Sequence, residues 1–413
     1  MLEKIYLFSM LVIILIQIFK PLFGSYLILL LFILNPTQFF PELENYRLYL
    51  IVSVVFCASS LLKGYTVNDK NQIQFIFLSV MYLLFIFLSI LFSGELASNA
   101  FTTTFNFLKV MFFSMILILF IKKMDEFQNI LRSFILGVCA NACFAIYEQF
   151  YPIPSRMEGT TLYRSEGLQA NPNALSTLLL SALPIAYYLY QRENNKYFRF
   201  LGLLTFILSI IGVFCTVSRM GVMVLLIVFA FLFKKNIKHI TFYVFMGIIA
   251  IIFFGFAKDL YTQRRTVTTT VSGRISLDAS TSMRIHLAKT AFLLWLKNPL
   301  FGVGLNNFDQ AAKEQLGERK VMGSTHNAYL QLLSEQGIFS LLIYIFFFVL
   351  AFKSLTIIKL YPLNELSEYL KIVLWVWIAI SFFGSIHGAY YLWLSLVFPL
   401  VLQKIYLNEQ LSV

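Results

Sequence analysis

Charged side chains are scarce in this sequence. Only 13% of the 413 residues are Asp, Glu, Lys or Arg, whereas 59% are hydrophobic and the mean hydropathy is +0.78. Soluble domains contain roughly 45–50% apolar residues, so a globular fold alone could not hide this much apolar surface. The low charge therefore excludes an ordinary soluble protein and predicts a polytopic membrane protein.

Cysteine is also rare, and its four positions all lie inside apolar runs. Cys139 and Cys143 are four residues apart and would share one face of a helix. This pattern excludes a disulfide framework and a zinc-ligand motif. We interpret Cys57, Cys139, Cys143 and Cys215 as packing residues.

Acidic side chains are fewer than basic ones, with 20 Asp and Glu against 32 Lys and Arg. Paired acids for metal-assisted chemistry are scarce in the segments expected outside the membrane, and the closest pair is Glu42 and Glu44. A metal site is therefore the minority interpretation. We predict neither a metal nor another cofactor.

Long apolar runs dominate the rest of the chain. Runs of roughly 15–25 residues can cross a hydrocarbon core of about 30 Å as helices, and their length excludes the alternating strands of a β-barrel. We expect an all-α polytopic membrane protein with about 12 crossings. The candidate spans are residues 5–19, 23–35, 46–62, 73–93, 103–121, 129–149, 171–190, 198–217, 220–233, 239–257, 327–352, 370–384 and 387–403.

The first segment leaves the exact number of crossings open. No small-residue cleavage site follows Lys4 before Lys20, so the N-terminus is expected to be retained as a signal-anchor. Residues 5–19 either form a thirteenth span or pair with residues 23–35 as a broken, partly interfacial segment.

Lysine and arginine in the short loops predict the orientation. Loops 122–126, 191–199, 234–239 and 353–371 are basic, whereas 93–99 and 386–389 carry no Lys or Arg, so the basic loops are expected in the cytoplasm. Four parts follow: N-terminal transmembrane helices (1–150), central transmembrane helices with a short outer loop (151–257), one large extracytoplasmic and partly helical loop (258–325), and C-terminal transmembrane helices (326–413).

Positive charge gathers in the loops that are expected outside. Residues 258–325 contain ten Lys and Arg against five Asp and Glu. Arg156 and Arg164 precede Asn171, a predicted N-cap with proline after it, and Arg219 separates two apolar segments. These arginines either face solvent and headgroups or bind an anion, for which the planar guanidinium is suited.

The large loop contains a predicted helix that begins at residues 280–282 and ends at Asn298. Helical periodicity puts Arg284 on the same face as the apolar Leu287, Ala291 and Leu294, so it should point toward the protein. His286 falls on the opposite face and is expected to be solvated.

A polar His-Asn pair opens the next long apolar helix, in the stretch STHNAYLQLLSEQGI (324–338). Thr325 or Asn327 could cap that helix with His326 as a passive neighbour. Alternatively, His326 accepts a proton, since histidine is the side chain best suited to do so near neutral pH.

Four motifs in order resemble the O-antigen ligase and O-antigen polymerase superfamily of bacterial envelope glycosyltransferases. They are YRSEGLQANPNALS (163–176), VSRMG (217–221), SMRIHLAKTAFLLWLKNPLFGVGLNNF (282–308) and STHNAYLQLLSEQGIFSLL (324–342). The resemblance covers roughly residues 150–350.

The resemblance implies a metal-independent, inverting, GT-C type glycosyltransferase in the bacterial cytoplasmic membrane, with its active site on the extracytoplasmic side. Its donor would be an undecaprenyl diphosphate-linked glycan, and its acceptor a glycan or a lipid-linked saccharide. Arg164, Arg219 and Arg284 would hold the diphosphate, and His326 would orient or deprotonate the acceptor. Arg284 would also take part in catalysis, and Arg156, Asn327 and Glu335 are secondary candidates.

Several alternatives stay open. The motifs do not separate a ligase from a polymerase or from an enzyme that transfers to protein. By periodicity Glu335 lies about half a turn from His326, which favours a structural role. The alternative of another class is a polysaccharide flippase or secondary transporter, although no internal repeat is found. No nucleic-acid partner is expected.

Overall fold

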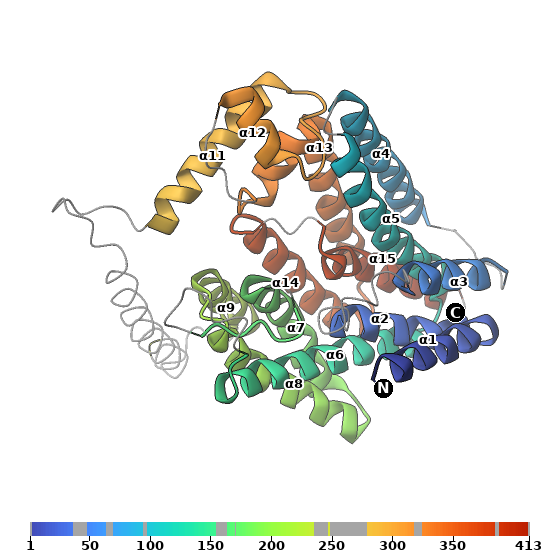
Figure 1. The fold of residues 1–413 in the computed structure, drawn as a ribbon. Coiled ribbons are helices and arrows are strands. Elements are labelled where there is room, and N and C mark those ends of the chain that lie inside the picture. The colour runs from blue at the N-terminus through green and yellow to red at the C-terminus, as the bar shows by residue number, and fades with distance from the viewer. Residues whose placement is uncertain are drawn as a thin grey trace. The chain divides into compact units, whose positions relative to one another are not determined.

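The computed structural model describes residues 2–35, 48–62, 69–93, 97–153, 163–169, 171–234, 247, 279–317, 324–384 and 388–411. Within these ranges the chain is helical and contains no strand, which confirms the all-α prediction (Figure 1). The helices are α1 (Leu2–Phe19), α2 (Pro21–Leu34), α3 (Leu48–Leu62), α4 (Lys70–Phe92), α5 (Ala97–Phe120), α6 (Met124–Phe150), α7 (Pro172–Arg192), α8 (Lys196–Cys215), α9 (Arg219–Leu232), α11 (Ala279–Lys297), α12 (Phe308–Leu316), α13 (Ala328–Thr356), α14 (Leu363–Ser381) and α15 (Tyr390–Leu411).

Five of these helices, α4, α6, α8, α13 and α15, are long and apolar enough to cross a membrane. Shorter apolar helices cover parts of α1, α2, α3, α5 and α9. Every predicted span except 239–257 coincides with a helix, and that segment lies almost entirely outside the described residues. The number of crossings and their orientation stay predictions.

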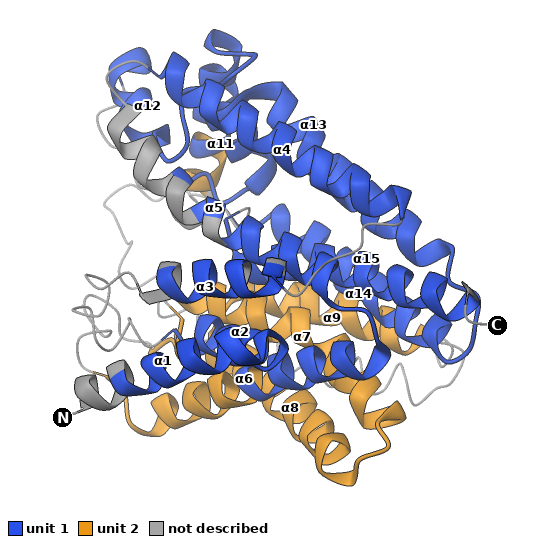
Figure 2. Cartoon of the chain, turned by 90° about the vertical axis from the view of Figure 1, so that its right-hand side faces the viewer, with its two compact units in different colours: residues 1–137, 287–413 blue, residues 138–286 orange. Residues whose placement is uncertain are grey.

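The chain divides into two compact units (Figure 2). Unit 1 contains residues 1–137 and 287–413, and unit 2 contains residues 138–286. The boundaries fall inside α6 and α11, so these two helices contribute to both units.

In unit 1, α13 packs against α4, α14 and α15, and α5 packs against α3, α4 and α15. Large aromatic side chains fill the space between these helices. Tyr82 of α4 and Trp393 of α15 are fully buried, and both rings contact Phe347 of α13. These contacts link the first and last thirds of the sequence into one core.

One end of unit 1 is closed by polar side chains of α15. Lys404 is buried, and its ammonium donates to the carbonyl oxygens of Ile118 (3.0 Å) and Leu119 (2.8 Å) at the end of α5. Gln403 accepts a hydrogen bond of 3.0 Å from the side chain of Asn71 at the start of α4. The last helix therefore satisfies backbone and side-chain groups of two much earlier helices.

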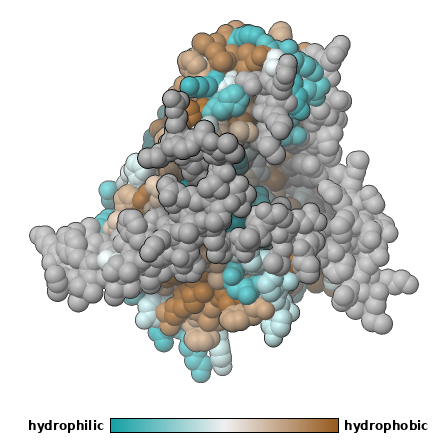
Figure 3. All heavy atoms as spheres, turned by 60° about the vertical axis from the view of Figure 1, so that its left-hand side comes forward, coloured by the Kyte–Doolittle hydropathy of each residue, from teal (hydrophilic) through white to brown (hydrophobic). Residues whose placement is uncertain are grey.

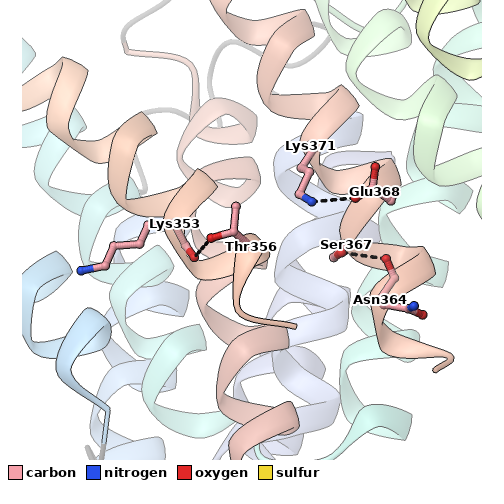
Figure 4. A network of polar contacts seen from close by, with 6 residues as sticks. All are labelled: Lys353, Thr356, Asn364, Ser367, Glu368 and Lys371. Atoms are coloured by element: carbon pink, nitrogen blue, oxygen red, sulfur yellow. Dashed lines mark hydrogen bonds and ion pairs between the residues drawn. The ribbon is translucent and has the colours of Figure 1, made fainter. Parts of the chain in front are cut away.

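Local polar contacts lie in the last turn of α13 and the first turns of α14, on either side of the connection between them (Figure 4). The Thr356 hydroxyl donates to the Lys353 carbonyl (2.8 Å), and the Ser367 hydroxyl donates to the Asn364 carbonyl (2.7 Å). Lys371 and Glu368 form an ion pair of 2.6 Å. Such exposed ion pairs contribute little stability.

In unit 2, α7 packs along α8 and against α9. A Cβ at Gly202 of α8 would lie 2.8 Å from both the Ala186 carbonyl oxygen and the Tyr190 nitrogen of α7. Glycine therefore permits the close approach of the two helices. Proline inside α7, at Pro184, is buried in this packing.

Many large apolar side chains remain exposed on the described helices, as expected where helices face lipid. The space-filling view shows brown apolar patches beside teal polar residues (Figure 3). On α4 the exposed residues Phe77, Val80, Leu84, Phe87 and Leu91 recur at helical spacing. This row is the exposed apolar side of α4, the side that lipid would contact if α4 crosses the membrane.

Candidate functional site

The loop before α7 is fastened to the end of α6 by hydrogen bonds to its backbone. One carboxylate oxygen of the buried Glu148 accepts from the amides of Glu166 (2.9 Å) and Gly167 (2.8 Å). The Ser165 hydroxyl donates to the Ala145 carbonyl (2.7 Å). Because a buried carboxylate requires such partners, Glu148 holds the loop at Glu166, two residues after Arg164, and so helps to position Arg164.

Arg164 joins this loop to the turn between α8 and α9. Its Nε donates to the Thr216 carbonyl oxygen (3.2 Å), and its Nη2 lies 3.5 Å from Oδ1 of Asn173. Oδ1 of Asn173 also accepts from the Ser218 hydroxyl (3.0 Å). Asn173 thus connects Arg164 to the residue that precedes Arg219.

The same contacts bring two helix N-termini together. Asn171 caps α7 by accepting from the Ala174 amide (2.8 Å), as the sequence predicts, and Ser218 caps α9 by accepting from the Gly221 amide (3.2 Å). Each N-terminus carries a partial positive charge and uncapped N–H groups. Two such ends beside guanidinium groups form an arrangement suited to an anionic ligand.

Backbone strain marks the turn that leads into α9. Val217 has a φ of +51°, in the left-handed region that β-branched residues rarely adopt. It lies between Thr216, whose carbonyl binds Arg164, and the cap Ser218. Arg219 follows as the first residue of α9, with its side chain exposed. We call Arg164, Asn173, Ser218 and Arg219 the arginine cluster.

His326 lies in unit 1, just before α13, and it too has a left-handed backbone, with a φ of +52°. The neighbouring residues Thr325 and Asn327 hold the backbone at His326 in place through their hydrogen bonds. The Thr325 hydroxyl donates to the Asn327 carbonyl (2.7 Å), and Asn327 caps α13 by accepting from the Leu330 amide (3.0 Å). The amide group of Asn327 also donates to the Phe382 carbonyl (3.3 Å). The predicted cap is therefore present, and it holds a half-buried histidine in a strained conformation.

A break interrupts α13 nine residues after its first residue. Gly337 has φ +78° and ψ −177°, a conformation essentially restricted to glycine. The loop from Pro299 to Gly304 makes hydrogen bonds with backbone groups of α13 that the break leaves without a partner inside the helix. The Ile338 amide donates to Pro299 (3.1 Å), and the Val303 and Gly304 amides donate to Ser334 (3.0 Å) and Glu335 (2.8 Å).

Glu335 strengthens this junction with its side chain. Its carboxylate is buried and accepts from the Asn306 amide (3.0 Å) and from the Gln331 side chain (3.0 Å). The Ser89 hydroxyl of α4 donates to the Glu335 carbonyl (2.8 Å). These contacts fit the structural role that periodicity favoured for Glu335.

Arg284 lies near the start of α11 and is half-buried. The predicted apolar face of this helix is buried at Leu287, Ala291 and Leu294, and the helix ends at Lys297, just before Asn298 as predicted. His286 is also half-buried, so it is less solvated than predicted.

The predicted site residues are only partly brought together. Arg164 and Arg219 adjoin through Asn173 and Ser218, whereas His326 belongs to the other compact unit. The convergence of the arginines on His326 therefore stays a prediction, as does the role of Arg284. Arg156 lies outside the described residues.

The described residues also bear on the predictions for metal ligands and cysteines. They contain no group of three His, Cys, Asp or Glu that could hold a metal ion. The described cysteines Cys139, Cys143 and Cys215 are free thiols, as expected.

Three residues that help to build the candidate site were not predicted from the sequence. Ser218 as an N-cap could have been predicted from its residue type before an apolar helix. Asn173 as a shared acceptor, and Glu148 as the carboxylate that holds the loop, depend on contacts between distant segments and left no local signal.

The described helices, five of them long and apolar enough to span a bilayer, identify the chain as a multi-pass helical membrane protein.

Residues 204–345, about a third of the chain, match the family model described as O-antigen ligase. This match confirms the resemblance to the O-antigen ligase and polymerase superfamily over these residues, and the family is one of glycosyltransferase-like enzymes that act on lipid-linked glycans and acceptors. The matched region runs from α8 into α13 and contains Arg219, Arg284 and His326, whereas Arg164 precedes it. No curated protein matches the chain.

Proposed function

We propose that this protein transfers a glycan from undecaprenyl diphosphate to an acceptor hydroxyl at the extracytoplasmic face of the cytoplasmic membrane. The observation that carries the proposal is the arginine cluster, in which Arg164 and Arg219 adjoin two helix N-termini. A diphosphate is the part of a lipid-linked glycan that such a cluster would recognise. The superfamily match supplies the reaction class.

In the proposed reaction, the acceptor oxygen forms a bond to the anomeric carbon as the bond between that carbon and the diphosphate oxygen breaks. The acceptor proton passes to the His326 imidazole. The electron pair of the broken bond leaves with undecaprenyl diphosphate, whose charge Arg164, Arg219 and Arg284 stabilise. Attack opposite the leaving group inverts the anomeric centre, and the guanidinium groups neutralise charge without a metal.

The decisive experiment uses the full-length protein in lipid nanodiscs with a defined undecaprenyl diphosphate glycan. One reaction receives lipid A core as acceptor, and another receives a second molecule of the donor, so that ligase and polymerase products differ in mass. We expect a glycosidic product and free undecaprenyl diphosphate in one of the two reactions. Donor binding without product in either reaction would refute transfer to these acceptors.

Arginine-to-lysine variants test the cluster itself. Lysine keeps the charge but loses the planar fork, so Arg164→Lys and Arg219→Lys should each raise the KM for the donor by about tenfold. Arg199→Lys is the matched control, because Arg199 is an exposed arginine of α8 in a predicted cytoplasmic loop. Equal KM values in all three variants would contradict the diphosphate role.

A further inference from the structure

One surface of unit 1 carries an apolar row. Phe292, Leu293 and Leu296 of α11 are 47%, 49% and 55% exposed, and Leu300 just beyond the helix is 49% exposed. Lys289 lies on the same side one turn earlier and is also exposed. We call Phe292, Leu293, Leu296 and Leu300 the α11 row.

The side chains on the opposite side of α11 are buried. Leu287, Ala291 and Leu294 are buried, so the α11 row is a second apolar face. A helix that is apolar on both sides is typical of a buried or a lipid-contacting position, and seldom of one that faces water.

The end of α11 is tied to helices that have the length and composition to cross the membrane. Beyond Lys297, the chain bonds to the break in α13 through the Pro299 carbonyl and the Ile338 amide (3.1 Å). Phe301 then stacks on Phe92 at the end of α4, with ring centroids 4.6 Å apart and planes 4° apart. The end of α11 is therefore fixed near the end of α4, and Figure 1 shows α11, α12 and α13 at the same end of unit 1 as the end of α4.

The α11 row adjoins the exposed apolar end of α4, a helix long and apolar enough to cross a membrane. Phe87, Leu91 and Phe92 of α4 are exposed, and they lead to Phe301 and Leu300. Phe85 of α4 stacks on Phe339 of α13 at 5.0 Å, which extends the same aromatic contact. Where the exposed apolar end of a candidate membrane-spanning helix meets the α11 row through the Phe92–Phe301 stack, the same acyl chains would solvate both.

We propose that α11 lies in the membrane interface with the α11 row inserted into the acyl chains of the bilayer. Lys289 fits this position, because its charged end can reach the headgroups while its stem covers apolar surface. Bilayer lipid is the occupant that continuity with α4 favours.

Site-directed labelling tests the proposal independently of any enzymatic activity. Phe292→Cys and Leu296→Cys are made separately in a full-length protein whose native cysteines are replaced by alanine, and each is labelled with a bimane fluorophore. Phe87→Cys on α4 is the lipid-facing control, and Lys313→Cys on the exposed side of α12 is the water-facing control. The proteins are reconstituted in phosphatidylethanolamine and phosphatidylglycerol vesicles without glycolipid.

Two quenchers then distinguish the environments. We expect brominated lipids to quench the labels at positions 292 and 296 at least half as strongly as the label at 87. Aqueous iodide should quench both at least threefold less than the label at 313. Iodide quenching equal to that at 313 would overturn the proposal, and protection from both quenchers would overturn it too, since another part of the chain would then cover the row.

Discussion

Replacing Gly337 with alanine should destabilise unit 1 far more than the loss of a hydrogen atom suggests. A Cβ at this position would collide with the backbone of Leu300 and Phe301, which cannot rotate out of the way as a side chain could. The φ of +78° with a ψ of −177° adds strain of about 1–3 kcal/mol for any residue with a Cβ. Alanine also favours a continuous helix, which would straighten α13 and displace the loop.

Displacing the loop removes hydrogen bonds that the break now makes. Three backbone bonds join Pro299, Val303 and Gly304 to α13, and each is worth about 0.5–1.5 kcal/mol net. Loss of one or two of them, added to the strain, gives a total of about 1.5–6 kcal/mol. The purified protein should therefore unfold at a clearly lower temperature, as measured by size-exclusion chromatography after heating in detergent.

Gly317 provides the matched control. It has a φ of +70° at the end of α12, but a Cβ there would meet no atom within 4 Å. Gly317→Ala should thus cost only the strain of a left-handed residue, about 1–2 kcal/mol. If Gly337→Ala lowers the unfolding temperature no more than Gly317→Ala does, the backbone contact at the break does not carry the stability assigned to it.

Three further predictions concern the candidate site. His326→Ala should reduce glycan transfer by about 100-fold or more while donor binding persists, and a near-normal product yield would remove the catalytic role. Arg284→Lys should already impair transfer, because the fork geometry matters beyond the charge; wild-type activity would make the residue structural. Asn327→Ala should lower stability by about 1 kcal/mol in the same heating assay, whereas Asn327→Asp should retain most of the cap; equal losses in both would contradict capping.

Local signals in the sequence predicted the helices well. Asn171 followed by proline gave the start of α7, and the spacing of Leu287, Ala291 and Leu294 gave the buried face of α11. These features depend on residues within a few turns of each other, which is the range over which capping and periodicity operate.

Features made by distant segments could not be predicted. The predicted span 327–352 runs through Ser334, Glu335, Gln336 and Gly337 as one helix, and its pattern does not locate the break that the structure shows at Gly337. Oxygens of Glu148 and Asn173 find their partners in other elements of unit 2. Whether His326 meets the arginine cluster depends on the placement of two units, which no local pattern specifies.

The polar end of α15 has a consequence for biogenesis. The carbonyls of Ile118 and Leu119 that end α5 are satisfied by Lys404, which the ribosome adds 286 residues after Ile118. Domains form from the N-terminus during synthesis, yet α5 cannot complete its bonding until α15 has been inserted. Newly made chains should therefore hold their early helices loosely in the translocon or with an insertase, and truncation before Lys404 should leave unit 1 a target for membrane proteases.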